Sequence, residues 1–91
     1  MYKIIKVTDR EGNIKEEFMR ELMTVHPNMM GKLLYPLNRE LVDAGMMRLC
    51  FIWTDNSNKV LRTSIIQDYT HQNKTTVVTT ENSIYTLERM E

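Results

Sequence analysis

The chain has 91 residues, the length of one small domain, and its 42% hydrophobic and 26% charged residues are ordinary for a globular protein. Its 12 Lys and Arg residues balance its 12 Asp and Glu residues, so the formal net charge is +0. This balance argues against nucleic acid or an anionic membrane as a partner, because the protein as a whole attracts neither.

The first half of the chain begins with a strand and continues with an amphipathic helix. Tyr2 to Val7 is rich in β-branched residues, and turn formers follow it as far as Asn13. Asn13 and Glu16 have the spacing of a capping box, in which two side chains cap the first turn of a helix. Apolar residues then recur at helical spacing, which predicts a helix of about three turns. They are Phe18, Leu22 and Val25.

Two prolines delimit the segment that follows. Pro27 ends the first helix, because it has no backbone N–H to donate and disfavours the helical conformation at His26. Residues 29–35 are ambiguous between a helical turn and a short loop. Pro36 is suited to the first position of a second helix, which we expect to end at Gly45.

The second half of the chain is predicted to be four antiparallel strands. After Gly45 the apolar period changes from about 3.6 residues to about 2, since Met47, Leu49, Phe51 and Trp53 alternate with their neighbours. The strands are expected at residues 46–53, 59–67, 75–80 and 83–89, with a polar connection at residues 68–74. Glu81 and Asn82 form a two-residue connection that suits a tight hairpin.

These elements predict an α+β fold. The N-terminal strand joins the edge of the C-terminal four-strand meander, which gives an antiparallel sheet of four to five strands packed against two helices. A strongly bent sheet that closes into a small barrel, with the helices as an insertion, is the alternative architecture. Either fold forms a single domain over residues 1–91.

The residues that usually carry catalysis or metal binding are few and scattered. His26 and His71 have no second histidine at ligand spacing, and the chain has one cysteine. Cys50 lies within an apolar run, which favours a buried structural thiol in a reducing compartment. The 3 glycines follow no phosphate-loop spacing. We therefore expect no metal, no cofactor and no enzymatic activity.

Methionine is abundant, with 8 residues in the chain. Thioether side chains adapt to irregular surfaces, so a methionine-rich face can form a protein interface. Met29, Met30 and Met46, on either side of the second predicted helix, are the candidates for such an interface. The alternative role of these methionines is to fill the core.

A second candidate surface combines polar side chains from two predicted strands and a turn. Arg62 and Ser64 lie on the second strand of the meander, and Asn82, Ser83 and Tyr85 lie at the last hairpin. If they share one face, they provide a guanidinium, amide and hydroxyl donors and an aromatic ring, which suit a phosphate or a nucleobase. The alternative is that hydroxyl and aromatic residues are simply good strand formers on a solvated face.

The same part of the chain carries a resemblance to known proteins. Two segments are similar to the tail of small phage and prophage accessory proteins: Val60-Leu61-Arg62-Thr63-Ser64 and Thr79-Thr80-Glu81-Asn82-Ser83-Ile84-Tyr85-Thr86-Leu87. The shared pattern is R-T-S and then T-x-N-S-x-Y-x-L, and it covers about one third of the chain. The resemblance implies an accessory protein that acts stoichiometrically, by blocking a host enzyme or by capturing a signalling nucleotide.

The leading hypothesis is a phage-encoded, cytoplasmic, non-enzymatic inhibitor that blocks a host defence protein by binding it through exposed strand edges and methionines. The first alternative is a protein that sequesters a small nucleotide signal, with Arg62, Asn82 and Tyr85 at the interface of a homo-oligomer. The second alternative is a nucleic-acid-associated module, which the zero net charge disfavours. No apolar run has the length of a membrane span, so we expect no membrane partner.

Overall fold

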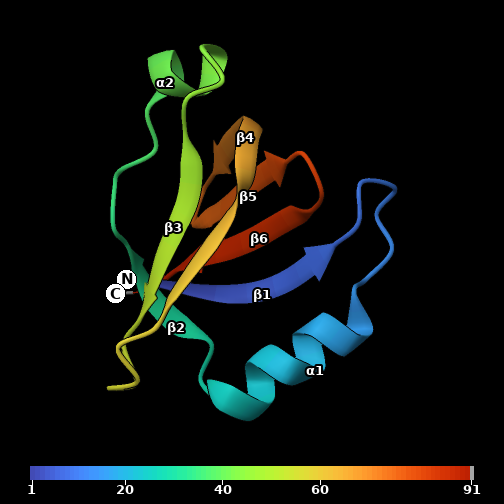
Figure 1. Ribbon diagram of the computed structural model, residues 1–91, viewed down its shortest axis with the longest axis vertical. Coiled ribbons are helices and arrows are strands. Elements are labelled where there is room, and N and C mark those ends of the chain that lie inside the picture. The colour runs from blue at the N-terminus through green and yellow to red at the C-terminus, as the bar shows by residue number, and fades with distance from the viewer. Residues whose placement is uncertain (91) are drawn as a thin grey trace.

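Within the residues that the structure describes, the protein has six strands and two helices. Figure 1 shows their arrangement in the computed structural model. The structure describes residues 1–90. The elements in chain order are β1 (Tyr2–Thr8), α1 (Glu16–Val25), β2 (Met30–Leu33), α2 (Arg39–Asp43), β3 (Arg48–Trp53), β4 (Val60–Gln72), β5 (Thr75–Thr80) and β6 (Ile84–Arg89).

The strands form a closed antiparallel barrel in the order β1-β2-β3-β4-β5-β6. Each strand pairs with the next one along the chain, and β1 closes the barrel by pairing with both β2 and β6. The prediction of an α+β sheet packed against two helices is therefore wrong, and the alternative small barrel is the architecture found. The predicted meander is present as β3 to β6, but β4 extends to Gln72, so most of the connection expected at residues 68–74 is strand.

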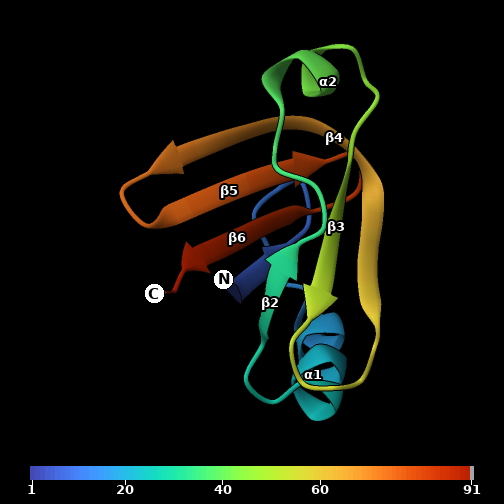
Figure 2. The same cartoon turned by 90° about the vertical axis from the view of Figure 1, so that its left-hand side faces the viewer.

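Bulges bend the strands enough to close the barrel. Register shifts interrupt the β1–β6, β3–β4 and β4–β5 ladders. Each bulge places an extra residue on one strand, which increases the local bend and twist. With 13 residues, β4 curves around the barrel and pairs with β3 through its first half and with β5 through its second half (Figure 2).

β2 is a strand that the sequence patterns did not predict, and Gly31 explains how it fits. Gly31 pairs with Tyr2 on one side and with Trp53 on the other, so β2 joins β1 to β3. A Cβ atom at this position would overlap the carbonyl oxygen of Ile52 and the ring of Phe51, whose Cζ would lie only 2.8 Å away. Glycine thus lets the backbone of β2 approach its neighbours more closely than a residue with a side chain could.

The barrel interior is the hydrophobic core. Alternate strand residues point inward, and the largest fully buried side chains include Ile4, Leu49, Phe51, Ile66 and Leu87. The alternation predicted for the first strand of the meander is confirmed, because Met47, Leu49, Phe51 and Trp53 are no more than 6% exposed. These side chains fill the barrel from within, so no layer of helices is needed to cover a sheet face.

The two helices lie at opposite ends of the barrel and not in one layer (Figures 1 and 2). No residue of α1 is fully buried, although several of its apolar side chains pack against the core. The predicted cap is absent, because Lys15 occupies the N-cap position and the amide of Asn13 donates to Asp9 in the preceding turn. The second helix is shorter than expected, since α2 has only 5 residues.

Candidate functional site

The structure separates the residues that were predicted to bind a ligand. Arg62 is exposed on β4, opposite Cys50 of β3. Ser83 and Tyr85 are buried, at 4% and 6% exposed, and Tyr85 belongs to the core cluster. Asn82 is exposed at the tip of the last hairpin. Arg62 and Tyr85 therefore lie on opposite sides of the barrel wall, and the predicted set forms no common face.

Ser64, the remaining member of this set, lies in the bulged part of β4. Its Oγ atom is buried and forms no hydrogen bond within residues 1–90. The neighbouring hydroxyl of Thr63 instead accepts a hydrogen bond from Leu49 N at 3.1 Å and donates to the carbonyl of Ser64 at 2.8 Å. Thr63, and not Ser64, therefore satisfies the backbone at the bulge.

The hairpin between β5 and β6 is closed by its own polar groups. Thr80 Oγ1 accepts from the Ser83 N–H at 3.1 Å and donates to the Ser83 carbonyl at 3.0 Å. Lys15 Nζ donates to Ser83 Oγ at 2.6 Å, and Arg10 Nη1 donates to the Thr80 carbonyl at 3.2 Å. Burial raises the pKa of the Tyr85 hydroxyl, while its hydrogen bond with Ser83 lowers it. These groups engage one another, which leaves few donors for a ligand at the hairpin.

The three methionines predicted to form an interface also lie apart. Met29 is 3% exposed and belongs to the core, which is the alternative role that the sequence suggested. Met30 is half-buried in β2, where it pairs with Lys3. Met46 is 73% exposed beyond the end of α2. Only Met46 is therefore available to a partner to any large extent.

A pocket of about 610 Å³ lies between the α2 region and the outer face of β3 and β4, and we call it the α2 pocket. Its apolar lining includes Tyr35, Leu37, Leu41, Met46, Met47 and Ile65. Its polar lining consists of Asn38, Arg48, Cys50 and Arg62. This pocket is the candidate functional site, because it combines a large apolar surface with a small number of polar side chains.

The β3–β4 ladder supplies the floor of the α2 pocket. Leu49 points into the barrel, so Arg48 and Cys50 on either side of it point outward. On the paired strand, Arg62 lies opposite Cys50, and Ile65 lies opposite Arg48. Residues three apart in a regular strand face opposite sides, but the bulge keeps both Arg62 and Ile65 on the pocket side. The buried thiol expected for Cys50 is confirmed, and it lies in this floor.

The segment from Leu34 to Met47 forms the roof of the α2 pocket. Backbone hydrogen bonds attach both of its ends to the barrel: Leu34 N donates to the Cys50 carbonyl at 2.9 Å, and Ile66 N donates to the Met47 carbonyl at 2.7 Å. Within the segment, Val42 is only 3% exposed and anchors α2 to the core cluster. The roof is therefore fixed at both ends and in the middle.

Polar contacts of α2 complete the roof. Asn38 Oδ1 caps the helix by accepting from Leu41 N at 3.1 Å. Arg39 donates to Asp68 at 2.8 Å and to the Tyr69 carbonyl at 2.7 Å, and its guanidinium lies 4.2 Å from the Tyr69 ring centroid. The hydrogen bond from Arg39 lowers the pKa of Asp68. Arg39 thus holds α2 against β4 and takes no part in the pocket lining.

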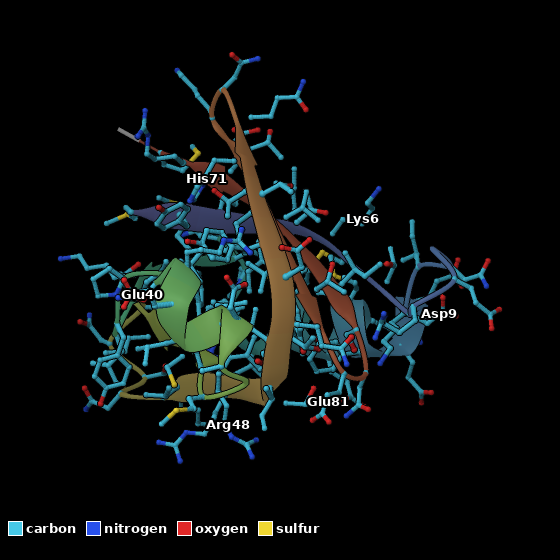
Figure 3. The ribbon with its side chains drawn as sticks, turned by 90° about the horizontal axis from the view of Figure 1, so that it is seen from above. Lys6, Asp9, Glu40, Arg48, His71 and Glu81 are labelled. Atoms are coloured by element: carbon cyan, nitrogen blue, oxygen red, sulfur yellow. The ribbon has the colours of Figure 1, made fainter. Side chains whose placement is uncertain are left out.

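The α2 pocket is electropositive. Arg48 is partly engaged, since its Nη1 donates to the Thr63 carbonyl at 3.1 Å. The side chain of Arg62 forms no hydrogen bond or ion pair within residues 1–90, and no carboxylate side chain belongs to the described lining. Glu81 lies along the same edge of the molecule as Arg48 (Figure 3), where its N–H donates to the Ile65 carbonyl, but it lies outside the lining. Two guanidinium groups therefore face the pocket without a matching negative charge in it.

The two histidines lie outside the α2 pocket and have partners of their own. His26 is 5% exposed, is hydrogen-bonded to Asp55, and stacks on Trp53. His71 and the hydroxyl of Thr76 form a hydrogen bond of 2.8 Å. Within residues 1–90, no group of three His, Cys, Asp or Glu side chains is placed to hold a metal ion.

Sequence reasoning identified two members of the α2 pocket, Arg62 as a ligand-binding residue and Met46 as an interface residue. The outward positions of Arg48 and Cys50 follow from the period-2 pattern of β3, which was the signal that could have found them. The contribution of Ile65 depends on the bulge in the β3–β4 ladder, and that of Leu37 depends on where the roof crosses the barrel. Neither the bulge nor the path of the roof can be predicted from a local sequence pattern.

Comparison with known proteins places the chain in no family. No family model matches it, and no curated protein or solved structure is significantly similar to it. None of the helices within residues 1–90 has the length and apolar character needed to cross a membrane.

Proposed function

We propose that the protein is a non-enzymatic binding protein that sequesters a small molecule in the α2 pocket. The observation that carries the proposal is the pocket itself, with a volume of about 610 Å³ and a largely apolar lining. Small-molecule sites in proteins are concave and mostly apolar, enclose roughly 300–1,000 Å³, and use a few polar groups to orient the ligand. The α2 pocket meets each of these criteria.

The polar groups of the lining suit binding better than reaction. The guanidinium groups of Arg48 and Arg62 are hydrogen-bond donors with no acceptor atom, which suits them to holding an anion. Asn38 uses its amide oxygen to cap α2, which leaves its NH₂ group as a donor. His26 and His71, the side chains best suited to proton transfer, lie outside the pocket. The protein would therefore hold its ligand unchanged, one ligand for each site.

Stoichiometric capture agrees with the role implied by the resemblance to phage accessory proteins, which remains a prediction. In that role the protein would remove a signalling molecule from the cytoplasm of the host. Of the ligand site suggested by the sequence, the proposal retains Arg62. It replaces Asn82, Ser83 and Tyr85 with residues of the α2 pocket, because these three lie at or behind the self-contained hairpin.

A fragment screen by NMR tests the proposal. We expect aromatic and aliphatic fragments to shift the amide signals of residues 37–47 and 62–65 in ¹⁵N-labelled protein. Leu41→Glu places a carboxylate in the lining and should abolish these shifts, whereas Met23→Glu, on the exposed surface of α1, should preserve them. Fragment shifts that map to another surface, or that persist in Leu41→Glu, would contradict the proposal.

A second candidate function is inhibition of a host protein. Tyr35 and Met46, which line the pocket, are 59% and 73% exposed, so they form an apolar rim accessible to a large partner. Together with Arg48 and Arg62, this rim is complementary to an acidic protein surface.

Met46→Asp distinguishes this second candidate from the first. If the rim binds a protein, the variant should lose a stoichiometric partner that the wild type recovers from host lysate. Recovery of the same partner by both proteins would exclude the rim. Sedimentation of the pure protein shows whether that partner is a second copy of the chain.

A further inference from the structure

We infer that the ligand of the α2 pocket is an amphipathic anion, with an apolar body and a terminal carboxylate or phosphate that Arg62 and Arg48 hold together. The inference rests on the proposed function, since it names the chemical class of ligand for the same pocket. It is carried by the placement of the two arginines, by the charges around them and by the apolar lining beside them.

The two arginines can reach one anion. Arg48 lies opposite Ile65 and Arg62 lies opposite Cys50, so the arginines are diagonal neighbours on adjacent strands. Diagonal neighbours in a regular antiparallel pair are roughly 7–8 Å apart, a distance that long side chains span. The bulge alters this spacing locally, but both arginines still line the same pocket. The hydrogen bond from Arg48 to the Thr63 carbonyl uses one nitrogen and limits the positions of its guanidinium, which leaves its other N–H groups to donate.

The two positive charges in the pocket favour a negatively charged ligand. Two arginines outside the pocket have polar side-chain partners: Arg39 pairs with Asp68, and Arg10 donates to Gln67. Arg62 has no such partner within residues 1–90, and the described lining contains no carboxylate to neutralise it. Two like charges on one floor repel each other, and a carboxylate or phosphate relieves this repulsion while matching the planar guanidinium fork.

The rest of the pocket lining favours a ligand with an apolar body. Leu37 and Leu41 from the roof face a site whose floor includes Ile65, and Met47 adds a flexible apolar side chain. A sugar in this position would lose water from its hydroxyl groups without gaining partners, which is unfavourable. An aromatic or branched aliphatic body fits the lining, and the exposed ring of Tyr35 offers a surface on which an aromatic body can stack.

Matched probes test the inference by calorimetry and NMR. Naphthaleneacetate, naphthyl phosphate and the neutral naphthaleneacetamide share one aromatic body and differ in their terminal group. We expect the two anions to bind the wild type at least about tenfold more tightly than the amide. Arg62→Gln should remove most of this preference, because it should weaken the binding of the two anions more than that of the amide. Arg20→Gln, on the exposed surface of α1, is the matched control and should bind all three probes as the wild type does.

Each outcome decides one of the two proposals. Equal binding of the amide and the anions, with shifts in the α2 pocket, would overturn the anion inference and leave the proposed function intact. Unchanged anion affinity in Arg62→Gln would overturn it as well. Failure of all three probes to shift any residue of the pocket would overturn the proposed function, and this inference with it. A preference for naphthyl phosphate over naphthaleneacetate identifies phosphate as the terminal group, and the reverse identifies carboxylate.

Discussion

The imidazole ring of His26 lies flat on the indole ring of Trp53, with ring centroids 3.8 Å apart and ring planes 7° from parallel. His26 follows the last residue of α1, and Trp53 is the last residue of β3. The same imidazole is hydrogen-bonded to Asp55 in the turn between β3 and β4. His26 therefore fastens the end of α1 to the barrel, a role that its position before a proline did not reveal.

Replacing His26 tests this attachment. His26→Ala removes a buried ring and leaves a cavity over Trp53, so we expect it to lower the free energy of unfolding by about 3 kcal/mol. His26→Phe keeps the aromatic stack and loses only the hydrogen bond to the partly exposed Asp55, so a loss of about 1 kcal/mol is expected. Urea denaturation of both variants provides the measurement. Equal losses in the two variants would show that the stack contributes little.

The acid stability of the protein should depend on Asp55. Hydrogen bonds from Ser57 and from His26 lower the pKa of Asp55 to about 2. Because this value lies below the unfolded-state pKa of about 4, the stabilisation is complete above pH 4 and is lost as the pH falls towards 2. We expect Asp55→Asn to be less stable than the wild type at neutral pH and to lose less stability between pH 4 and pH 2.

Urea denaturation at a series of pH values measures this difference in slope. The pH dependence of Asp68→Asn is measured for comparison with that of Asp55→Asn. The pKa of Asp68 is also lowered, by its hydrogen bond with Arg39. Parallel pH profiles for the wild type and Asp55→Asn would rule out a contribution of Asp55 to acid stability.

The sequence predicted those parts of the fold that depend on neighbouring residues. The alternation from Met47 to Trp53 gave β3 and its inward face, and the polar pair Glu81-Asn82 marked the last hairpin. The closed barrel was not the leading prediction, because β2 has only 4 residues and is a strand through pairing with distant partners, not through its own pattern. The α2 pocket was missed for the same reason, since its floor depends on a bulge and its roof on long-range contacts.

Gly31 should be the least replaceable glycine of the chain. In Gly31→Ala the new methyl group would meet the Ile52 carbonyl and the Phe51 ring, so β2 would have to move away from β3. We expect a loss of about 3 kcal/mol or failure to fold. Gly12→Ala is the control, because its Cβ would meet no atom within 4 Å and its cost of about 1 kcal/mol would come only from the positive φ. A loss for Gly31→Ala no greater than that for Gly12→Ala, measured by thermal unfolding, would show that the β2–β3 contact can relax.

Ser64 should be replaceable by alanine with a gain in stability. Its buried Oγ has no hydrogen-bond partner within residues 1–90, so the folded state bears the cost of removing this hydroxyl from water without compensation. We expect Ser64→Ala to raise the free energy of unfolding by about 1 kcal/mol, whereas Thr63→Ala, which breaks the hydrogen bond from Leu49 N, should lower it by about 2 kcal/mol. Ser64→Ala should also leave probe binding in the α2 pocket unchanged, because Ser64 does not belong to the lining. A destabilised Ser64→Ala variant would show that the hydroxyl is stabilised in the folded protein. Weaker binding of naphthaleneacetate by this variant would return Ser64 to the ligand site beside Arg62.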